Sequence, residues 1–203
     1  MKHPENIQEV ALLQPDYLGF IFYPKSPRNF ERIIPDISGN IKKTGVFVNG
    51  EIDFILEKVK KYNFKAIQLH GSESTEYCRQ LRNQLDVKAT SAIEIFKVFG
   101  IKDQFDFSIL KKYEGIVDYF LFDTKGKSKG GNGYTFDWNV LKAYNSNTPI
   151  ILSGGIGMEE LDKVEEILKS DLPIYALDLN SKFELEPALK DVKLLENFLK
   201  KIK

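Results

Sequence analysis

The sequence predicts an α/β fold made of repeated strand–helix units. Short apolar runs rich in β-branched and aromatic residues recur along the chain, each followed by a polar or glycine-bearing turn. Runs such as YFLF and PIIL are continuously apolar, which is typical of parallel strands buried on both faces. The segments between them space their apolar residues by three and four, so they indicate amphipathic helices that cover a sheet.

Seven strands and four helices are expected from this pattern. The strands are Tyr17–Phe22, Thr44–Val48, Ala66–Leu69, Val87–Ala92, Tyr119–Phe122, Ile150–Leu152 and Ile174–Leu177. The helices are Pro4–Leu13, Asp53–Tyr62, Thr75–Leu85 and Met158–Lys169. Because the first helix precedes every expected strand, the residues leave two architectures open: an open doubly wound sheet, or a (β/α)8 TIM barrel that lacks its first strand.

Composition limits the possible partners. The 203 residues, 42% of them hydrophobic, predict a single domain over residues 1–203. Twenty-nine basic residues balance 29 acidic ones, which argues against nucleic acid or an anionic membrane as a partner. The N-terminal segment has no apolar signal-peptide core, and no apolar run approaches the roughly 20 residues that span a bilayer. With Cys78 as its only cysteine, the chain is expected in the reducing cytoplasm with a small-molecule ligand.

A glycine-rich segment follows the sixth expected strand. In SGGIG (153–157), Gly154 and Gly155 allow backbone N–H groups to approach an anion, and the next helix adds its positive end. The loop after the last strand, with Asp178 and Ser181, lies where many barrels bind phosphate. The sequence favours a phosphate site here, with a plain structural turn and a capping aspartate as the alternatives.

Three further side chains that follow strands are candidates for chemistry. Asp123 ends the strand Tyr119–Phe122 beside the long loop Lys125–Thr135, so it is a candidate general acid or base. Arg28 is able to grip a carboxylate in bidentate fashion. His70 is able to donate to a ligand. Each also has a structural interpretation, respectively as a capping residue, a solvated arginine and a partner of a loop carbonyl.

Seven motifs occur in a distinctive order: GFIFYPKSPR, TGVFVNG, IQLHG, LFDTK, GGNGYTFDW, LSGGI and ALDLNS. In order and spacing they resemble the phosphoribosylanthranilate isomerases of tryptophan biosynthesis, from about Pro4 to the C-terminus. The resemblance implies a (β/α)8 TIM barrel that rearranges a phosphosugar, N-(5-phosphoribosyl)anthranilate, to the 1-deoxyribulose phosphate by Amadori chemistry, with no metal and no organic cofactor. Other phosphosugar barrels, such as epimerases, do not share the Phe-Asp-Trp string at Phe136–Trp138.

The resemblance also implies roles for the candidate residues. Asp123 matches the family's general acid, which protonates the furanose oxygen, and Arg28 matches an arginine near the anthranilate carboxylate. His70 and Asp178 match residues that line the substrate pocket. The residues that match the phosphate-holding loops are Gly154, Gly155 and Ser181.

Two departures from the family pattern change the expected behaviour. Family members begin with a strand ending in Cys-Gly-Met, whose cysteine removes the C2 proton, whereas residues Met1 to Asn6 here resemble the segment that immediately follows Cys-Gly. Cys78 lies in an expected helix, where packing is its natural role. The 203 residues are therefore expected to bind ligand weakly, to turn over little, and to be monomeric or self-associate through an exposed barrel edge. The alternative is a non-catalytic phosphosugar-binding or regulatory paralogue.

The second departure is Lys182, which stands where the family usually has a glycine. If that position requires a positive φ, lysine is expected to cost roughly 1 kcal/mol and to reshape the phosphate loop.

Overall fold

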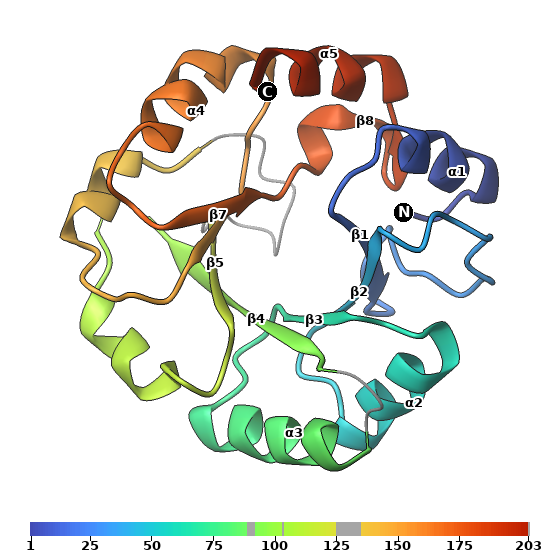
Figure 1. Cartoon of the computed structure of the whole chain (residues 1–203), viewed down its shortest axis with the longest axis horizontal. Helices are drawn as coiled ribbons and strands as arrows, with labels where there is room; N and C mark the ends of the chain where they lie inside the picture. The colour runs from blue at the N-terminus through green and yellow to red at the C-terminus, as the bar shows by residue number, and fades with distance from the viewer. Residues whose placement is uncertain (89–91, 103, 125–134, 203) are drawn as a thin grey trace.

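The computed structural model describes residues 1–88, 92–102, 104–124 and 135–202. Its main sheet is parallel and curls into a ring with the helices outside (Figure 1). In chain order the strands are β1 (Tyr17–Phe22), β2 (Lys42–Phe47), β3 (Ala66–Leu69), β4 (Glu94–Ile101), β5 (Tyr119–Thr124), β6 (Ile150–Leu152) and β7 (Ile174–Leu177). Among the described residues β1 pairs only with β2 and β7 only with β6, so the barrel wall has a gap between β7 and β1. The architecture is the expected barrel and not a doubly wound sheet.

The outer layer combines α-helices with shorter 3-10 segments. The helices are α1 (Pro4–Leu12), α2 (Ile52–Tyr62), α3 (Thr75–Lys88), α4 (Leu161–Leu168) and α5 (Val192–Ile202). The 3-10 segments are η1 (Phe107–Tyr113), η2 (Trp138–Ala143), η3 (Met158–Glu160) and η4 (Ser181–Phe183), and a small antiparallel hairpin joins β8 (Glu184–Glu186) to β9 (Leu189–Lys190). The expected helix over 158–169 therefore divides into η3 and α4. Helices α1 and α5, from opposite ends of the chain, lie side by side at the gap (Figure 1).

The expected strand Val87–Ala92 is wrong. Val87 belongs to the last turn of α3, residues 89–91 lie outside the described part, and the strand in this region is β4, from Glu94 to Ile101. Lys97 interrupts the apolar pattern of β4, which hid the strand. Its ammonium group is nevertheless buried because Glu73 lies 3.0 Å away.

Apolar side chains fill both sides of the sheet. Inside the ring, a small cluster comes from β3 to β6: Ala66, Phe96, Val98, Leu121 and Ile151. A much larger cluster packs between the sheet and the outer layer. In that layer the connection from β1 to β2, residues 23–41, contains no α-helix. Aromatic side chains pack on the outside of these strands, including Phe22 and Phe47, whose ring centroids are 5.4 Å apart.

A side-chain bridge links the two edge strands across the gap. At the first residue of β1 the Tyr17 hydroxyl is 2.9 Å from the hydroxyl of Tyr175 in β7. The Tyr17 hydroxyl also donates to Glu94, and Lys42 binds the same carboxylate at 2.7 Å. The Tyr175 ring lies 4.3 Å from that of Tyr119. The gap is thus bridged at the amino ends of the strands by side chains instead of by backbone pairing.

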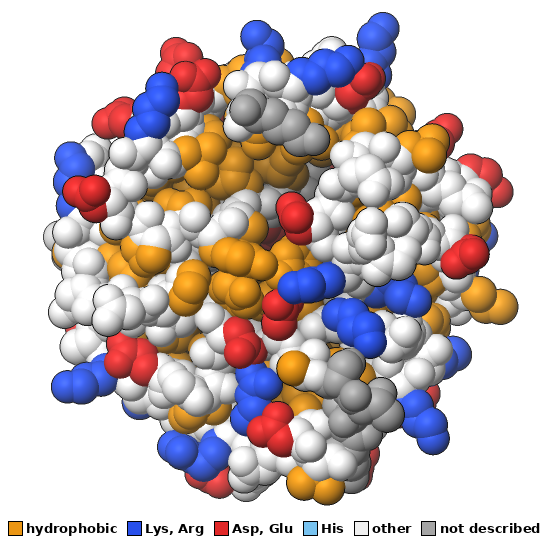
Figure 2. Space-filling model, in the orientation of Figure 1, with side chains coloured by type: hydrophobic (Ala, Val, Ile, Leu, Met, Phe, Trp, Pro, Cys, Tyr) orange, Lys and Arg blue, Asp and Glu red, His pale blue; other side chains and the backbone are white. Residues whose placement is uncertain are grey.

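The surface carries charges of both signs. Figure 2 shows hydrophobic side chains gathered at the centre of the drawn face, with acidic and basic side chains beside them. Among the described residues, none of the helices is long and apolar enough to cross a membrane.

Candidate active site

The candidate residues meet at the carboxyl ends of the strands. His70 follows β3, Asp123 lies near the end of β5, Ser153 follows β6 and Asp178 follows β7. Because all these strands are parallel, their carboxyl ends lie at one end of the barrel. The structure therefore brings together side chains that are more than 100 residues apart in the sequence, as the sequence led us to expect.

Asp123 and His70 face each other at the centre of this site. The Nε2 atom of His70 is 3.4 Å from Oδ2 of Asp123, and Asp123 is only 8% exposed. The Nδ1 atom of the same histidine lies 3.1 Å from the side-chain amide of Gln68, which points to the same side of β3. Sequence reasoning missed Gln68, because a glutamine in a buried strand gives no signal of its own.

Asp178 lies close enough to Asp123 for their carboxylates to interact. Desolvation by the surrounding chain raises the pKa of Asp178, a hydrogen bond from Ser153 opposes that shift, and the nearby Asp123 carboxylate adds to it. Ser153 donates to Oδ2 of Asp178 at 3.0 Å. The site thus holds two neighbouring acidic groups. Asp178 has a stronger tendency to keep its proton than an ordinary aspartate has.

This raised pKa predicts a pH-dependent gain in stability for Asp178→Asn. A carboxyl group whose pKa is higher in the folded than in the unfolded protein destabilises the fold at pH values above its folded pKa. Below its unfolded pKa, where it is protonated in both states, it has no such effect. The substitution should raise the free energy of unfolding by about 1 kcal/mol near neutral pH and by much less at a pH of about 3. Urea unfolding at both pH values tests this, with Asp171→Asn at an exposed position as the control. Equal gains at the two pH values would contradict the assignment.

The glycine loop after β6 approaches the end of β5 very closely. Gly154 and Gly155 adopt φ values of 89° and 75°, the left-handed region that favours glycine. A Cβ atom on Gly154 would lie 2.4 Å from the backbone nitrogen of Thr124 and 2.7 Å from Oδ1 of Asp123. Any side chain at this position would therefore push the loop away from the candidate acid.

The loops after β6 and β7 adjoin each other. Ser181 begins η4, and the stem of Lys182 lies over Gly157, where a Cβ atom would be 3.1 Å from it. Among the described residues, the non-glycine positions with positive φ are Gln14, Asn49, Asn63 and Ala188, so Lys182 is not in the left-handed region. The strain considered for Lys182 is absent, and its ammonium group binds Glu159 at 3.0 Å.

Arg28 is already engaged by a carboxylate. Its Nε and Nη2 atoms contact the Glu184 carboxylate at 2.9 and 2.5 Å, and Lys190 reaches the same group at 3.3 Å. Burial acts to raise the pKa of Glu184, but Arg28 and Lys190 hold that pKa below its ordinary value. The sequence predicted the carboxylate-binding tendency of Arg28 but not this partner, which is 156 residues away along the chain.

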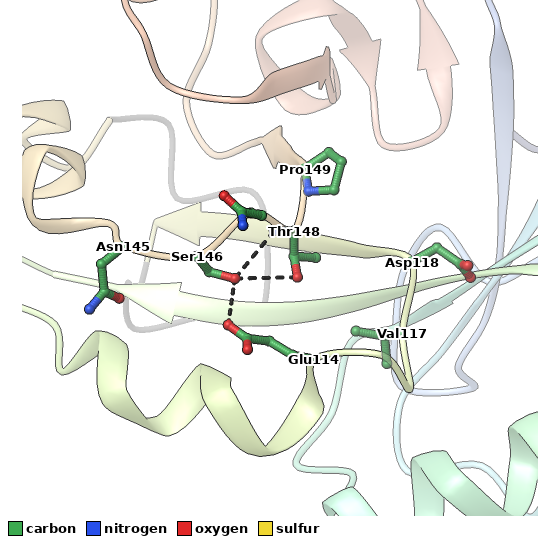
Figure 3. Close-up of a pocket in the computed structure, with 8 residues that line it drawn as sticks. Glu114, Val117, Asp118, Asn145, Ser146, Thr148 and Pro149 are labelled. Atoms are coloured by element: carbon green, nitrogen blue, oxygen red, sulfur yellow. Dashed lines mark hydrogen bonds between the residues drawn. The ribbon is translucent and has the colours of Figure 1, made fainter.

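The long loop after β5 falls largely on residues 125–134, which lie outside the described part. A hollow of about 380 Å³ is lined by residues just before β5 and β6, including Glu114, Asp118, Ser146 and Thr148 (Figure 3). Because it lies at the amino ends of these strands, it is separate from the candidate active site.

The chain is similar to known proteins in sequence and in fold. Residues 1–201 match the profile of the family described as N-(5'phosphoribosyl)anthranilate (PRA) isomerase. The chain is 41% identical over 209 residues to N-(5'-phosphoribosyl)anthranilate isomerase of Parabacteroides distasonis, covering 100% of this chain and 90% of that protein. Its fold is similar to the crystal structure of phosphoribosyl anthranilate isomerase from Thermotoga maritima, with a TM-score of 0.80, 28% identity and coverage of 100% and 95%.

A further similar structure is that of a phosphoribosyl anthranilate isomerase in complex with reduced 1-(o-carboxyphenylamino)-1-deoxyribulose 5-phosphate. It has a TM-score of 0.77 and 26% identity, and the match covers 98% of this chain and 93% of that one. The profile match over nearly the whole chain and the 41% identity are sufficient to assign the family. The chain therefore belongs to the N-(5'-phosphoribosyl)anthranilate isomerase family.

Proposed function

We propose that this site carries out the Amadori rearrangement of N-(5-phosphoribosyl)anthranilate to 1-(2-carboxyphenylamino)-1-deoxyribulose 5-phosphate, a step of tryptophan biosynthesis. The main support, beyond family membership, is the position of the Asp123 carboxyl group. It lies between His70 and the glycine loop at Gly154, at the carboxyl ends of the strands. A positioned carboxyl group is able to protonate a leaving ring oxygen, and the adjoining glycine loop offers backbone N–H groups for a phosphate.

In this proposal Asp123 donates its proton to the furanose oxygen. The bond between C1 and that oxygen breaks while the nitrogen lone pair forms a C=N bond, which leaves a Schiff base and an open chain. A base then removes the C2 proton, and the electrons move toward nitrogen to give an enolamine that becomes the ketone. Gly154, Gly155 and Ser181 hold the phosphate, and His70 and Asp178 line the pocket around the reacting carbons.

Arg28 is proposed to bind the anthranilate carboxylate. Glu184 occupies the Nε–Nη2 edge of its guanidinium group and thereby fixes its orientation. The Nη1 N–H groups do not take part in the contacts with Glu184. A planar guanidinium group held in this way is able to bind a second carboxylate without moving.

The second half of the reaction needs a base, which Cys78 does not supply. Cys78 is buried in α3, and burial raises the pKa of its thiol to about 11, so it stays protonated near neutral pH. We propose that the 203 residues alone turn over slowly, because a missing general base costs about 10²–10⁴-fold in rate. A derivative is useful for testing this, here called the strand-extended chain, in which a short apolar strand ending in Cys-Gly is added before Met1.

A binding measurement tests whether the 203 residues form the proposed pocket. Reduced 1-(2-carboxyphenylamino)-1-deoxyribulose 5-phosphate should quench or shift the fluorescence of Trp138, the only tryptophan, as it is titrated. The same compound without its phosphate should bind at least about tenfold more weakly, since charge-assisted contacts to the phosphate are lost. Equal binding of the two compounds, by fluorescence and calorimetry, would remove the phosphate site from the proposal.

A second candidate function is that of a non-catalytic phosphosugar-binding or regulatory protein, which would use the proposed binding groups without the chemistry. The two functions differ in one result: a regulatory protein would bind the reduced product in both forms, and the strand-extended chain would remain inactive. Location in the cytoplasm and self-association through the open edge also stay predictions. The bridge between Tyr17 and Tyr175 counts against a fully open edge.

A further inference from the structure

A contact between Gln68 and His70 bears on which nitrogen of His70 carries the proton. The two residues are two positions apart at the end of β3, so their side chains lie on the same face of the sheet, inside the barrel. The Gln68 amide nitrogen is 3.1 Å from Nδ1 of His70, and Gln68 is only 9% exposed. An amide NH₂ group is a donor only, so in this orientation of Gln68 the Nδ1 atom accepts, and the ring proton of a neutral histidine lies on Nε2.

The backbone on both sides of His70 is held in place. The His70 N–H donates to the carbonyl of Phe47 in β2 at 2.8 Å. The Gly71 N–H donates to the Glu73 carboxylate at 3.0 Å, and the Lys97 ammonium group donates to the Gly71 carbonyl at 3.0 Å. The backbone from which the His70 ring extends is therefore fixed. The Gln68 contact acts on the ring itself, at Nδ1.

The fixed tautomer has a consequence for the two oxygens of Asp123. An Nε2–H group of His70 points at Oδ2, 3.4 Å away. The other oxygen, Oδ1, faces Gly154, where a Cβ atom would come within 2.7 Å of it. In a protonated carboxyl group the carbonyl oxygen is the better acceptor, so a hydrogen bond accepted at Oδ2 favours the proton on Oδ1. That oxygen is the one next to the loop proposed to hold the phosphate.

We propose that Gln68 is a positioning residue: it fixes His70 as the Nε2–H tautomer, and His70 thereby confines the transferable proton of Asp123 to Oδ1. The tautomer is argued from the Gln68 contact, whereas its catalytic role rests on the proposed function. With the Gln68 amide reversed, its oxygen would require a proton on Nδ1, and Nε2 would become an acceptor for a proton on Oδ2 of Asp123. The two arrangements place the acid proton on opposite oxygens.

Nitrogen NMR distinguishes these arrangements in the chain as it is. The sequence has two histidines, His3 and His70, so ¹⁵N-labelled histidine gives two ring systems, which His70→Asn assigns. At a pH of about 8, where an ordinary histidine is neutral, we expect the His70 signals of a protonated Nε2 and a bare Nδ1. A protonated Nδ1 with a bare Nε2 would overturn the proposal.

The substitution Gln68→Glu provides the sharper test because it replaces the donor with an acceptor of nearly the same size. We expect Nδ1 of His70 to take up a proton in this variant, while the control Gln80→Glu, on the exposed face of α3, leaves the His70 spectrum unchanged. An unchanged spectrum in folded Gln68→Glu would contradict the proposal. If Gln68→Glu does not fold, Gln68→Met replaces it. The expected result is then a mixture of the two His70 tautomers, and a pure Nε2–H tautomer would contradict the proposal.

Activity gives an independent readout. In the strand-extended chain Gln68→Glu should lower kcat by about tenfold or more, as expected when an acid is misplaced, and change KM little, because Gln68 is not proposed to touch the substrate. Gln80→Glu should leave both unchanged. An inactive strand-extended chain would reject the proposed function and leave the NMR result to decide the tautomer. Full activity of Gln68→Glu with the expected change in tautomer would reject the catalytic role alone.

Discussion

Replacing Asp123 with asparagine is expected to lower kcat of the strand-extended chain by about 10²–10⁴-fold. Asparagine has nearly the same shape and still accepts a hydrogen bond at the position of Oδ2, but it has no acidic proton to give to the furanose oxygen. Because Asp123 is buried between His70 and Gly154, solvent cannot easily take over its role. Steady-state kinetics with the phosphoribosyl substrate measures the effect.

Binding of the reduced product should survive this substitution. That compound is already open and needs no proton, so its affinity for Asp123→Asn should stay within about threefold of the parent chain, a difference of well under 1.4 kcal/mol. The control Asp53→Asn makes the same chemical change on the exposed surface of α2 and should alter neither kcat nor binding. Loss of product binding together with activity would mean that Asp123 supports the fold and not the chemistry.

Replacing Lys97 with methionine should lower the free energy of unfolding by about 3–5 kcal/mol. The side chains of Lys97 and Glu73 are 3% and 1% exposed, and removing the ammonium group leaves the carboxylate buried without its counter-ion. The Glu73 carboxylate would still accept the N–H groups of Asn49 and Gly71, which is too little to balance a full charge. Urea unfolding followed by circular dichroism measures the loss.

Two further variants separate the buried pair from an ordinary surface pair. Adding Glu73→Gln to Lys97→Met should recover part of the lost stability, because the buried charge disappears. Lys182→Met breaks the pair of Lys182 with the 77%-exposed Glu159 and should cost less than 1 kcal/mol. If Lys97→Met costs no more than Lys182→Met, the buried pair does not stabilise this end of the barrel.

Sequence periodicity predicted the bounds of several strands. β1, β3, β6 and β7 have the predicted bounds, because each is a short run flanked by clear turn residues. It failed at β4, where Lys97 sits in the middle of a buried strand. A rule that excludes lysine from buried strands cannot anticipate Glu73, which follows a different strand and neutralises the charge.

The candidate site was predictable where one residue type points to one kind of chemistry. The glycine loop at Gly154 and the strand-end Asp123 are of this kind, and the structure brings both to one end of the barrel. The residues that orient His70 and Arg28 were not predictable. Gln68 acts through the tautomer of His70, and Glu184 reaches Arg28 from a distant hairpin, so both depend on three-dimensional contacts that leave no local pattern.

We propose that these 203 residues contain the acid and the binding groups of the isomerase site but not its base. Turnover of N-(5-phosphoribosyl)anthranilate by the 203-residue chain, by the strand-extended chain and by its Cys→Ala control tests this most directly. We expect the strand-extended chain to be faster than both others by about 10²–10⁴-fold. Equal and substantial rates for all three would contradict the account, because the base would then have to lie within the 203 residues.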